Sequence, residues 1–100
     1  MSIKLVIVTT RPSELTPWFD EVEGNMEKIA EAIAHLQATP GFLGQTMETT
    51  QLKRTKTLEF ADDVAIRNYV TANEADVQHR GSVKEAYLLE HGCTEDIYLA

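Results

Sequence analysis

Hydrophobic positions along the chain follow two periods, and the change falls at Thr-Pro-Gly-Phe-Leu-Gly, residues 39–44. Pro40 cannot continue a helix, and Gly41 can take the positive φ of a tight reversal. The pattern therefore predicts one long helix over residues 17–38, capped by Thr16, and a strand that begins at Phe42. Apolar residues at helical spacing before the change are Phe19, Val22, Met26, Ile29, Ile33 and Leu36.

Three other stretches alternate as strands do. Residues 3–10 are rich in β-branched side chains and are apolar on both faces from Leu5 to Val8. Residues 42–49 and 55–61 are joined by the polar segment 50–54, which predicts an antiparallel hairpin. Residues 93–99 are predicted to form the last strand of the sheet.

Helical patterns fill the space between the hairpin and the last strand. Asp62 or Asp63 is expected to cap a second helix that loosens near Asn73. Residues 74–80 are predicted to add a turn or two that stops at Gly81. Ser82 and Glu85 then have the spacing of a capping box, which predicts a separate short helix through Leu88 or Leu89 that is ended by His91-Gly92. The alternative for Tyr87 to Leu89 is a strand.

The order strand, helix, strand, strand, helix, strand predicts a fold of the α+β class. It is the split βαβ arrangement of a ferredoxin-like fold, an antiparallel sheet with its helices on one face, in a single domain over residues 1–100. The first strand needs cover on both faces, but the helices supply only one layer. We therefore expect a homodimer formed through the sheets, with a cavity between the sheet and the second helix.

Charge and composition narrow the possible partners. The 100 residues include 9 Lys and Arg against 16 Asp and Glu, a net charge of −7, which argues against nucleic acid or an anionic membrane as the main partner. No apolar run approaches the roughly 20 residues of a membrane span, and the first residues lack a secretory signal pattern, so a cytoplasmic location is expected. The single cysteine, Cys93, has acidic neighbours and no nearby cation, so we expect it to be inert.

Several short motifs together carry a resemblance to a known family. They are the 17–38 helix pattern, Thr-Pro-Gly-Phe-Leu-Gly, the hairpin ending in Leu-Glu-Phe-Ala-Asp-Asp at residues 58–63, and His79-Arg80. In these the chain resembles the dimeric α+β barrel proteins of the antibiotic biosynthesis monooxygenase type. The resemblance implies oxygenation of phenols and quinols without a cofactor or haem degradation, and the family also includes many proteins with no known activity.

Two differences from that family argue against haem degradation. The third strand of family members usually ends in Trp, where this chain has Phe60. Haem-degrading members carry Asn at the end of the first strand, where this chain has Thr9 and Thr10. Of the Asn, Trp and His set, only His79 has a counterpart here.

His79 is the candidate catalytic residue. A neutral imidazole could take a proton from a phenol and leave an electron-rich carbanion that reacts with dioxygen without metal or flavin. The alternative is a polar residue at a helix end beside Arg80. The sequence shows no phosphate-binding Gly-rich loop, zinc-ligand spacing or nucleophile elbow, and no cofactor or metal is predicted.

Four side chains are candidates for binding the substrate, with core packing as the alternative reading for each. Two function classes follow. One is a small oxygenase acting on an aromatic or quinol molecule between sheet and helices, and the other is a non-catalytic dimeric module that binds a small hydrophobic ligand or only assembles. The fold is compatible with both. The four candidate substrate-binding residues are Phe60, Tyr69, Trp18 and Met47.

Overall fold

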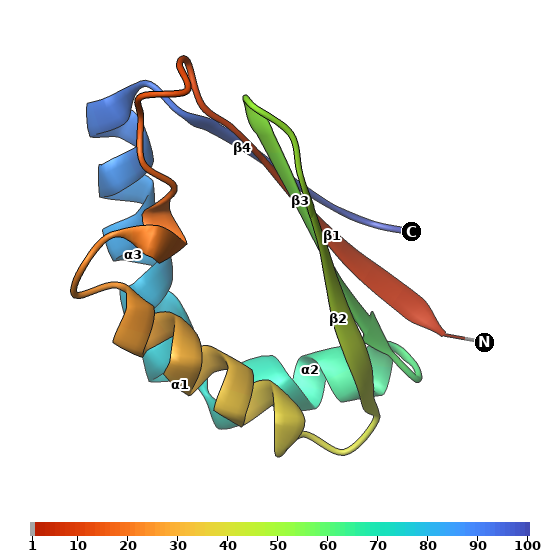
Figure 1. Ribbon diagram of the computed structural model, residues 1–100. Coiled ribbons are helices and arrows are strands. Elements are labelled where there is room, and N and C mark those ends of the chain that lie inside the picture. The colour runs from red at the N-terminus through yellow and green to blue at the C-terminus, as the bar shows by residue number, and fades with distance from the viewer. Residues whose placement is uncertain (1) are drawn as a thin grey trace.

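The computed structural model describes residues 2–100 as one antiparallel sheet with its helices on one face (Figure 1). The strand order is β2-β3-β1-β4, and β1 pairs with both β3 and β4. This arrangement confirms the predicted ferredoxin-like α+β fold. The elements are β1 (Ile3–Thr10), the 3₁₀ helix η1 (Phe19–Glu21), α1 (Met26–Gln37), β2 (Phe42–Thr49), β3 (Lys53–Phe60), α2 (Asp63–Ala72), α3 (Glu74–His91) and β4 (Thr94–Leu99).

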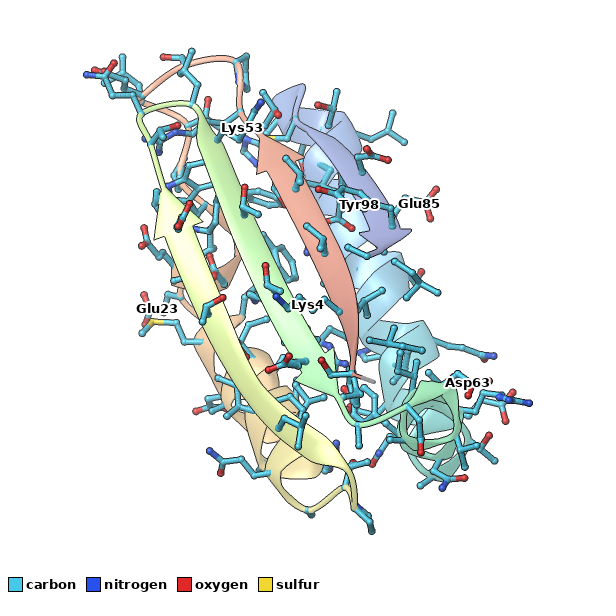
Figure 2. All side chains as sticks on the ribbon, turned by 90° about the vertical axis from the view of Figure 1, so that its right-hand side faces the viewer. Lys4, Glu23, Lys53, Asp63, Glu85 and Tyr98 are labelled. Carbon is cyan, nitrogen blue, oxygen red and sulfur yellow. The ribbon has the colours of Figure 1, made fainter. Side chains whose placement is uncertain are left out.

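Strand register places apolar side chains on both faces of the sheet, as the sequence of β1 predicts. Leu5 lies opposite Leu58, which is buried against the helices. The next residue, Val6, lies opposite Tyr98 of β4 and so belongs to the outer face, together with Val8. Figure 2 views this outer face, with Lys4, Lys53 and Tyr98 labelled, and no helix crosses it.

The core lies where β3 meets α1 and α2. Phe60 is fully buried, and its ring meets Phe42 edge to face, with 5.5 Å between the ring centroids. Aromatic pairs in this geometry add to the stability that burial alone provides. Phe60 shares this cluster with Leu36, Leu58, Ala65 and Tyr69.

The predicted first helix, residues 17–38, is wrong over residues 17–25. The only helical element between β1 and Gly24 is η1, which Trp18 precedes as N-cap, so Thr16 does not begin a long helix. Gly24 has φ +90°, a conformation that interrupts an α-helix, and α1 begins only at Met26. Trp18 and Phe19 are both buried, so packing of the large aromatic side chains prevails over the helical spacing of this segment.

The predicted change of period at residues 39–44 is confirmed. α1 ends at Gln37, Gly41 has φ +88°, and β2 begins at Phe42. The Gly41 carbonyl accepts a hydrogen bond of 2.7 Å from the Ala61 N–H, and a Cβ at Gly41 would lie 2.7 Å from the Cβ of Ala65. Glycine is therefore required here by backbone conformation and by space.

Strand β3 begins two residues earlier than predicted, at Lys53. The turn closes tightly because the Thr50 N–H donates to the Lys53 carbonyl at 2.8 Å. The Lys53 N–H in turn donates to the Thr50 hydroxyl at 3.2 Å. The polar composition of residues 50–54 predicts a turn through Arg54, but Arg54 belongs to strand β3. Strand β4 begins at Thr94 rather than at Cys93.

Helix α3 is continuous from Glu74 to His91, so the predicted stop at Gly81 and the helix cap at Ser82 are wrong. A glycine inside a helix costs about 1 kcal/mol relative to alanine, which weakens a helix without ending it. The predicted break near Asn73 is confirmed, and α3 ends as expected before Gly92, whose φ is +70°.

The end of the β3–α2 connection supplies a test of these helix boundaries. The Asp62 carboxylate accepts a 3.0 Å hydrogen bond from the Ala65 N–H, so Asp62→Ala should cost about 1 kcal/mol. We expect the melting temperature to fall by about 4–8 °C. Ser82→Ala is the control, because an exposed residue inside α3 should tolerate alanine or gain slightly. Thermal unfolding in which Ser82→Ala is the more damaging change would contradict these boundaries.

Candidate functional site

A cleft lies between the sheet and the layer formed by η1, α1 and α3. It consists of two adjoining cavities, and in the larger one about 200 Å³ is open to the centres of water-sized molecules. The sequence predicts a cavity between the sheet and the second helix, but the cleft lies mainly under η1, α1 and α3, and α2 contributes only Tyr69 to its lining. Five residues line both cavities: Ile7, Phe19, Ile29, Lys56 and Lys84.

The larger cavity is mostly apolar. Its walls come from α1 on one side and from the helix-facing side chains of the sheet on the other. Gly81 of α3 also lines it, and no atom lies within 4 Å of the place where a Cβ would be. The missing side chain keeps this part of the cleft open. Apolar residues of the wall include Ala32, Ile33, Leu36, Leu58, Val77 and Ile97.

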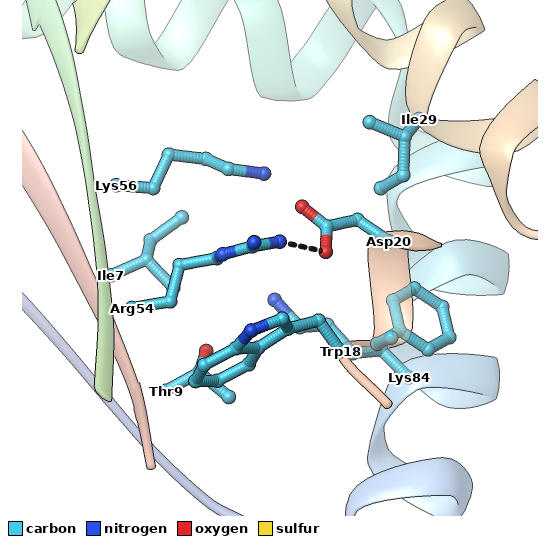
Figure 3. Close-up of a pocket in the computed structure, with 9 residues that line it drawn as sticks. Ile7, Thr9, Trp18, Asp20, Ile29, Arg54, Lys56 and Lys84 are labelled. Carbon is cyan, nitrogen blue, oxygen red and sulfur yellow. Dashed lines mark hydrogen bonds and ion pairs between the residues drawn. The ribbon is translucent and has the colours of Figure 1, made fainter. Parts of the chain in front are cut away.

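Arg54 dominates the smaller, charged end of the cleft (Figure 3). Its Nη1 lies 2.5 Å from Asp20 Oδ1 and its Nη2 lies 2.9 Å from Glu21 Oε1. The Arg54 and Asp20 side chains are only 10% and 17% exposed, so their ion pair is largely shielded from water, whereas the Glu21 side chain is 61% exposed. The guanidinium also lies 4.8 Å from the ring centroid of Trp18, over which Arg11 lies at 4.3 Å. These contacts hold η1 against β3.

Two other cations of the cleft are also neutralised. Lys84 Nζ lies 2.6 Å from Glu95 Oε2, and the Thr9 hydroxyl donates to the same carboxylate oxygen at 3.3 Å. Arg80 lies 2.8 Å from Asp76 and donates to the Tyr69 hydroxyl at 3.1 Å. Each of these basic side chains therefore has a carboxylate partner from the protein itself.

Lys56 differs from the other basic side chains of the cleft. Among residues 2–100 it has no ion-pair or hydrogen-bond partner within contact distance, and its amine extends from β3 toward the Asp20 carboxylate, which is paired with Arg54 (Figure 3). Burial lowers the pKa of the Lys56 amine from its usual value. Asp20 and Glu95 act to raise this pKa, and Lys84 and Arg54 act to lower it further.

The structure brings only some of the predicted site residues into the cleft. Trp18 lines its charged end and Tyr69 lines its apolar end. Phe60 lies in the core beside Tyr69, with 6.5 Å between the ring centroids, and does not line the cleft. Met47 is half-exposed on β2, and His79 is exposed on α3; neither lines the cleft.

Sequence reasoning missed the basic residues of the cleft. Arg54, Lys56, Leu58 and Phe60 alternate along one face of β3, and the two apolar members of this set require that face to be covered by helices. That alternation is the signal that could have found the two cations. The predicted turn through Arg54 conceals that residue, whereas Lys56 alternates with Leu58 and Phe60 in the predicted strand but carries no local sign of a site.

Other candidate chemistry is limited in the part of the chain that the structure describes. Burial raises the pKa of the Cys93 thiol, with Arg11 opposing, which agrees with the expectation that this cysteine is inert. Across residues 2–100 no group of three or more His, Cys, Asp and Glu side chains is arranged to hold a metal ion. Within the same range, no helix combines the length and the apolar character needed to span a bilayer.

Comparison with solved structures places this geometry among known folds. SnoaB, a cofactor-independent oxygenase from Streptomyces nogalater, superposes with a TM-score of 0.68 in a mutant form and 0.64 in a second structure. The chain has the fold of this oxygenase. The two alignments cover 99% of this chain and 90% of SnoaB, at 17% and 16% identity. The predicted resemblance to monooxygenases of the antibiotic biosynthesis type is thereby confirmed for the fold.

A second neighbour has no known activity. A protein of unknown function from Nitrosomonas europaea matches with a TM-score of 0.56 and 11% identity, over 100% of this chain and 88% of that protein. No protein-family model and no curated protein matches the sequence. At these identities the likeness is one of fold, and function has to be argued from the cleft.

The Arg54 pairing predicts a large difference between two arginine variants. Arg54→Leu would leave the Asp20 carboxylate, only 17% exposed, without its partner, and we expect a loss of about 3 kcal/mol in the free energy of unfolding. Arg67→Leu is the matched control, because Arg67 pairs with Asp63 on the exposed surface of α2, where such pairs contribute about 0.5 kcal/mol or less. Urea unfolding that shows equal losses would contradict the role given to Arg54.

Proposed function

We propose that the protein is a cofactor-independent oxygenase of an aromatic or quinol small molecule that binds in the cleft. The observation that carries this proposal is a mostly apolar cavity that is lined by Lys56, whose amine has no ion-pair partner among residues 2–100. Ligand sites commonly combine apolar walls with a few placed polar groups. The fold shared with the oxygenase SnoaB supports the reaction class.

The chemistry requires only that the substrate lose a proton inside a dry site. A deprotonated phenol or quinol is electron-rich and can itself donate an electron to dioxygen. Apolar walls favour the reaction with dioxygen because they exclude water. Water would compete for hydrogen bonds to the substrate oxygens and weaken the electrostatic interactions in the site. The protein must then hold the ring and accept the proton, and a base has to lie within hydrogen-bond reach to do so.

Oxygen consumption tests this function directly. Dihydroxyanthracene or another quinol should be oxidised in air without added metal or flavin, as measured with an oxygen electrode. A general base contributes about a hundredfold or more to the rate. Because His79 is exposed and does not line the cleft, we expect His79→Ala to keep most of this turnover. A hundredfold loss in that variant would instead support the histidine as the base.

A non-catalytic binding module is the second candidate, and the position of His79 favours it. The one base that the sequence predicts lies outside the cavity, as it could in a protein that only binds its ligand. If no quinol in a panel is consumed while an aromatic ligand raises the melting temperature, the binding module is the correct reading. Ligands that bind only the folded state stabilise it.

We also propose that two copies associate through their outer sheet faces. The helices cover one face of the sheet, and the opposite face carries Val6, Val8 and the half-exposed Tyr98 (Figure 2). Val6 is already buried within one chain, and two sheets stacked on these faces would also cover the partly exposed Val8 and Tyr98. A stable pair of this kind would be expected to bury roughly 2,000 Å² or more.

Sedimentation equilibrium tests the dimer. The wild-type protein should sediment as a dimer at micromolar concentration, and Val8→Lys should shift it to monomer by burying a charge in the interface. Within one chain this lysine is tolerable, because Val8 lies opposite Asp96 and Thr55. Leu15→Lys is the control, since Leu15 is 92% exposed in the loop before η1. A monomeric wild-type protein would exclude this assembly.

A further inference from the structure

We propose that the Lys56 amine accepts the hydroxyl proton of a phenol or quinol bound in the cleft and then holds the resulting phenolate as an ammonium–phenolate pair. This inference rests on the proposed function in one respect, namely that the ligand is a hydroxylated aromatic molecule. It adds the residue that activates this ligand and the chemical group by which the ligand is recognised.

Lys56 occupies a central position in the cleft. Lys56 lies on the helix-facing side of β3 and lines both cavities, so its amine stands where the charged and apolar ends of the cleft meet. Ile7, Phe19 and Ile29 line both cavities as well. An aromatic ring packed on these three side chains in the larger cavity would bring a ring hydroxyl close to the amine.

Among the basic side chains of the cleft, Lys56 is the one best suited to accept a proton. Arg54 and Arg80 cannot act as bases, because guanidinium stays protonated in proteins. Lys84 Nζ already lies 2.6 Å from a carboxylate oxygen of Glu95, so it has an anionic partner within the protein. Lys56 has no partner of this kind within residues 2–100. A ligand oxyanion would supply the missing partner.

Lys56 is surrounded by charges of both signs, and burial is the largest influence on it. Burial lowers its pKa, which increases the fraction of neutral amine available to take a proton. Lys84 and Arg54 act in the same direction, whereas Asp20 and Glu95 oppose them. The charged and titratable groups that face the cleft around Lys56 are Asp20 of η1, Arg54 of β3, Tyr69 of α2, Arg80 and Lys84 of α3, and Glu95 of β4.

The proton transfer balances without a co-reactant. The substrate O–H bond breaks, a new N–H bond forms on the amine lone pair, and the electron pair of the broken bond stays on the substrate oxygen. A neutral amine and a neutral phenol thus become an ammonium ion and a phenolate. Their attraction is strong because the surrounding walls are largely apolar. The later reaction with dioxygen belongs to the proposed function and not to this step.

A coloured ligand that cannot be turned over tests the step by itself. 2-Hydroxyanthraquinone is already oxidised, and its phenolate absorbs at longer wavelength than its phenol. Bound to the wild-type protein, its ionisation midpoint should fall by about one pH unit or more relative to free solution, equivalent to about tenfold tighter binding of the phenolate. In Lys56→Met the midpoint should return to the solution value. Lys53→Met is the matched control, because Lys53 is an exposed lysine on the same strand.

A second variant separates the base from a simple positive charge. Lys56→Arg keeps the charge but cannot accept a proton, so it should still lower the midpoint of the bound reporter. Oxidation of the quinol by this variant should nevertheless fall by about a hundredfold. Equal turnover in wild type and Lys56→Arg would overturn the assignment of Lys56 as base. Lys56→Gln repeats the binding measurement if the methionine variant fails to fold.

The outcomes distinguish this inference from the proposed function. The inference is overturned if the ionisation midpoint of the bound reporter is the same in Lys56→Met as in the wild-type protein. It is also overturned if the wild-type protein does not bind the reporter. Either result counts even if quinols are oxidised. A shifted midpoint without any oxygen uptake would support the phenolate site and reject the oxygenase.

Discussion

The shape of the cleft depends on one set of contacts, the pairing of Arg54 with the shielded Asp20 and with the more exposed Glu21. Removing a guanidinium from water is costly unless carboxylates meet its donors, and here two carboxylates from η1 do so. The same side chain lies over the ring of Trp18. A strand in the middle of the sheet is thereby joined to a segment that has little regular structure of its own. That segment forms the charged end of the cleft.

Two glycines have opposite roles in the architecture. Gly41 allows the chain to reverse between α1 and β2, and its position against Ala65 leaves no space for a side chain. Gly81 lies inside α3 in ordinary helical conformation with open space around it. One glycine therefore permits close packing at the end of the sheet, and the other preserves the cavity between sheet and helices.

The distribution of charge within the cleft narrows the ligand chemistry more than the fold does. SnoaB and a protein of unknown function share this fold, so the fold is compatible with more than one role. In this chain Arg54, Arg80 and Lys84 have carboxylate partners, and Lys56 does not. An aromatic ligand with an acidic hydroxyl would satisfy both the apolar walls and the unpaired amine. This is the basis on which we connect the cleft to quinol chemistry.

The amino-acid sequence by itself determined the class of the fold. Local patterns were sufficient for this: alternation in β1 and the hairpin, helical spacing before Gly41, and a capping aspartate before α2. Each of these signals depends on neighbours within a few residues. The sequence also identified Trp18 and Tyr69 as residues of a pocket.

Only the tertiary structure decided which polar residues meet. Arg54 and Asp20 are separated by 34 positions, and nothing in either local sequence indicates the other. Burial of Trp18 and Phe19 overrides the helical spacing around them, and continuous packing of α3 overrides the stop signal at Gly81. The place of Lys56 in the cleft follows from the same long-range packing. Side chains from distant segments set the electrostatics of a site, because charge interacts through space and not along the chain.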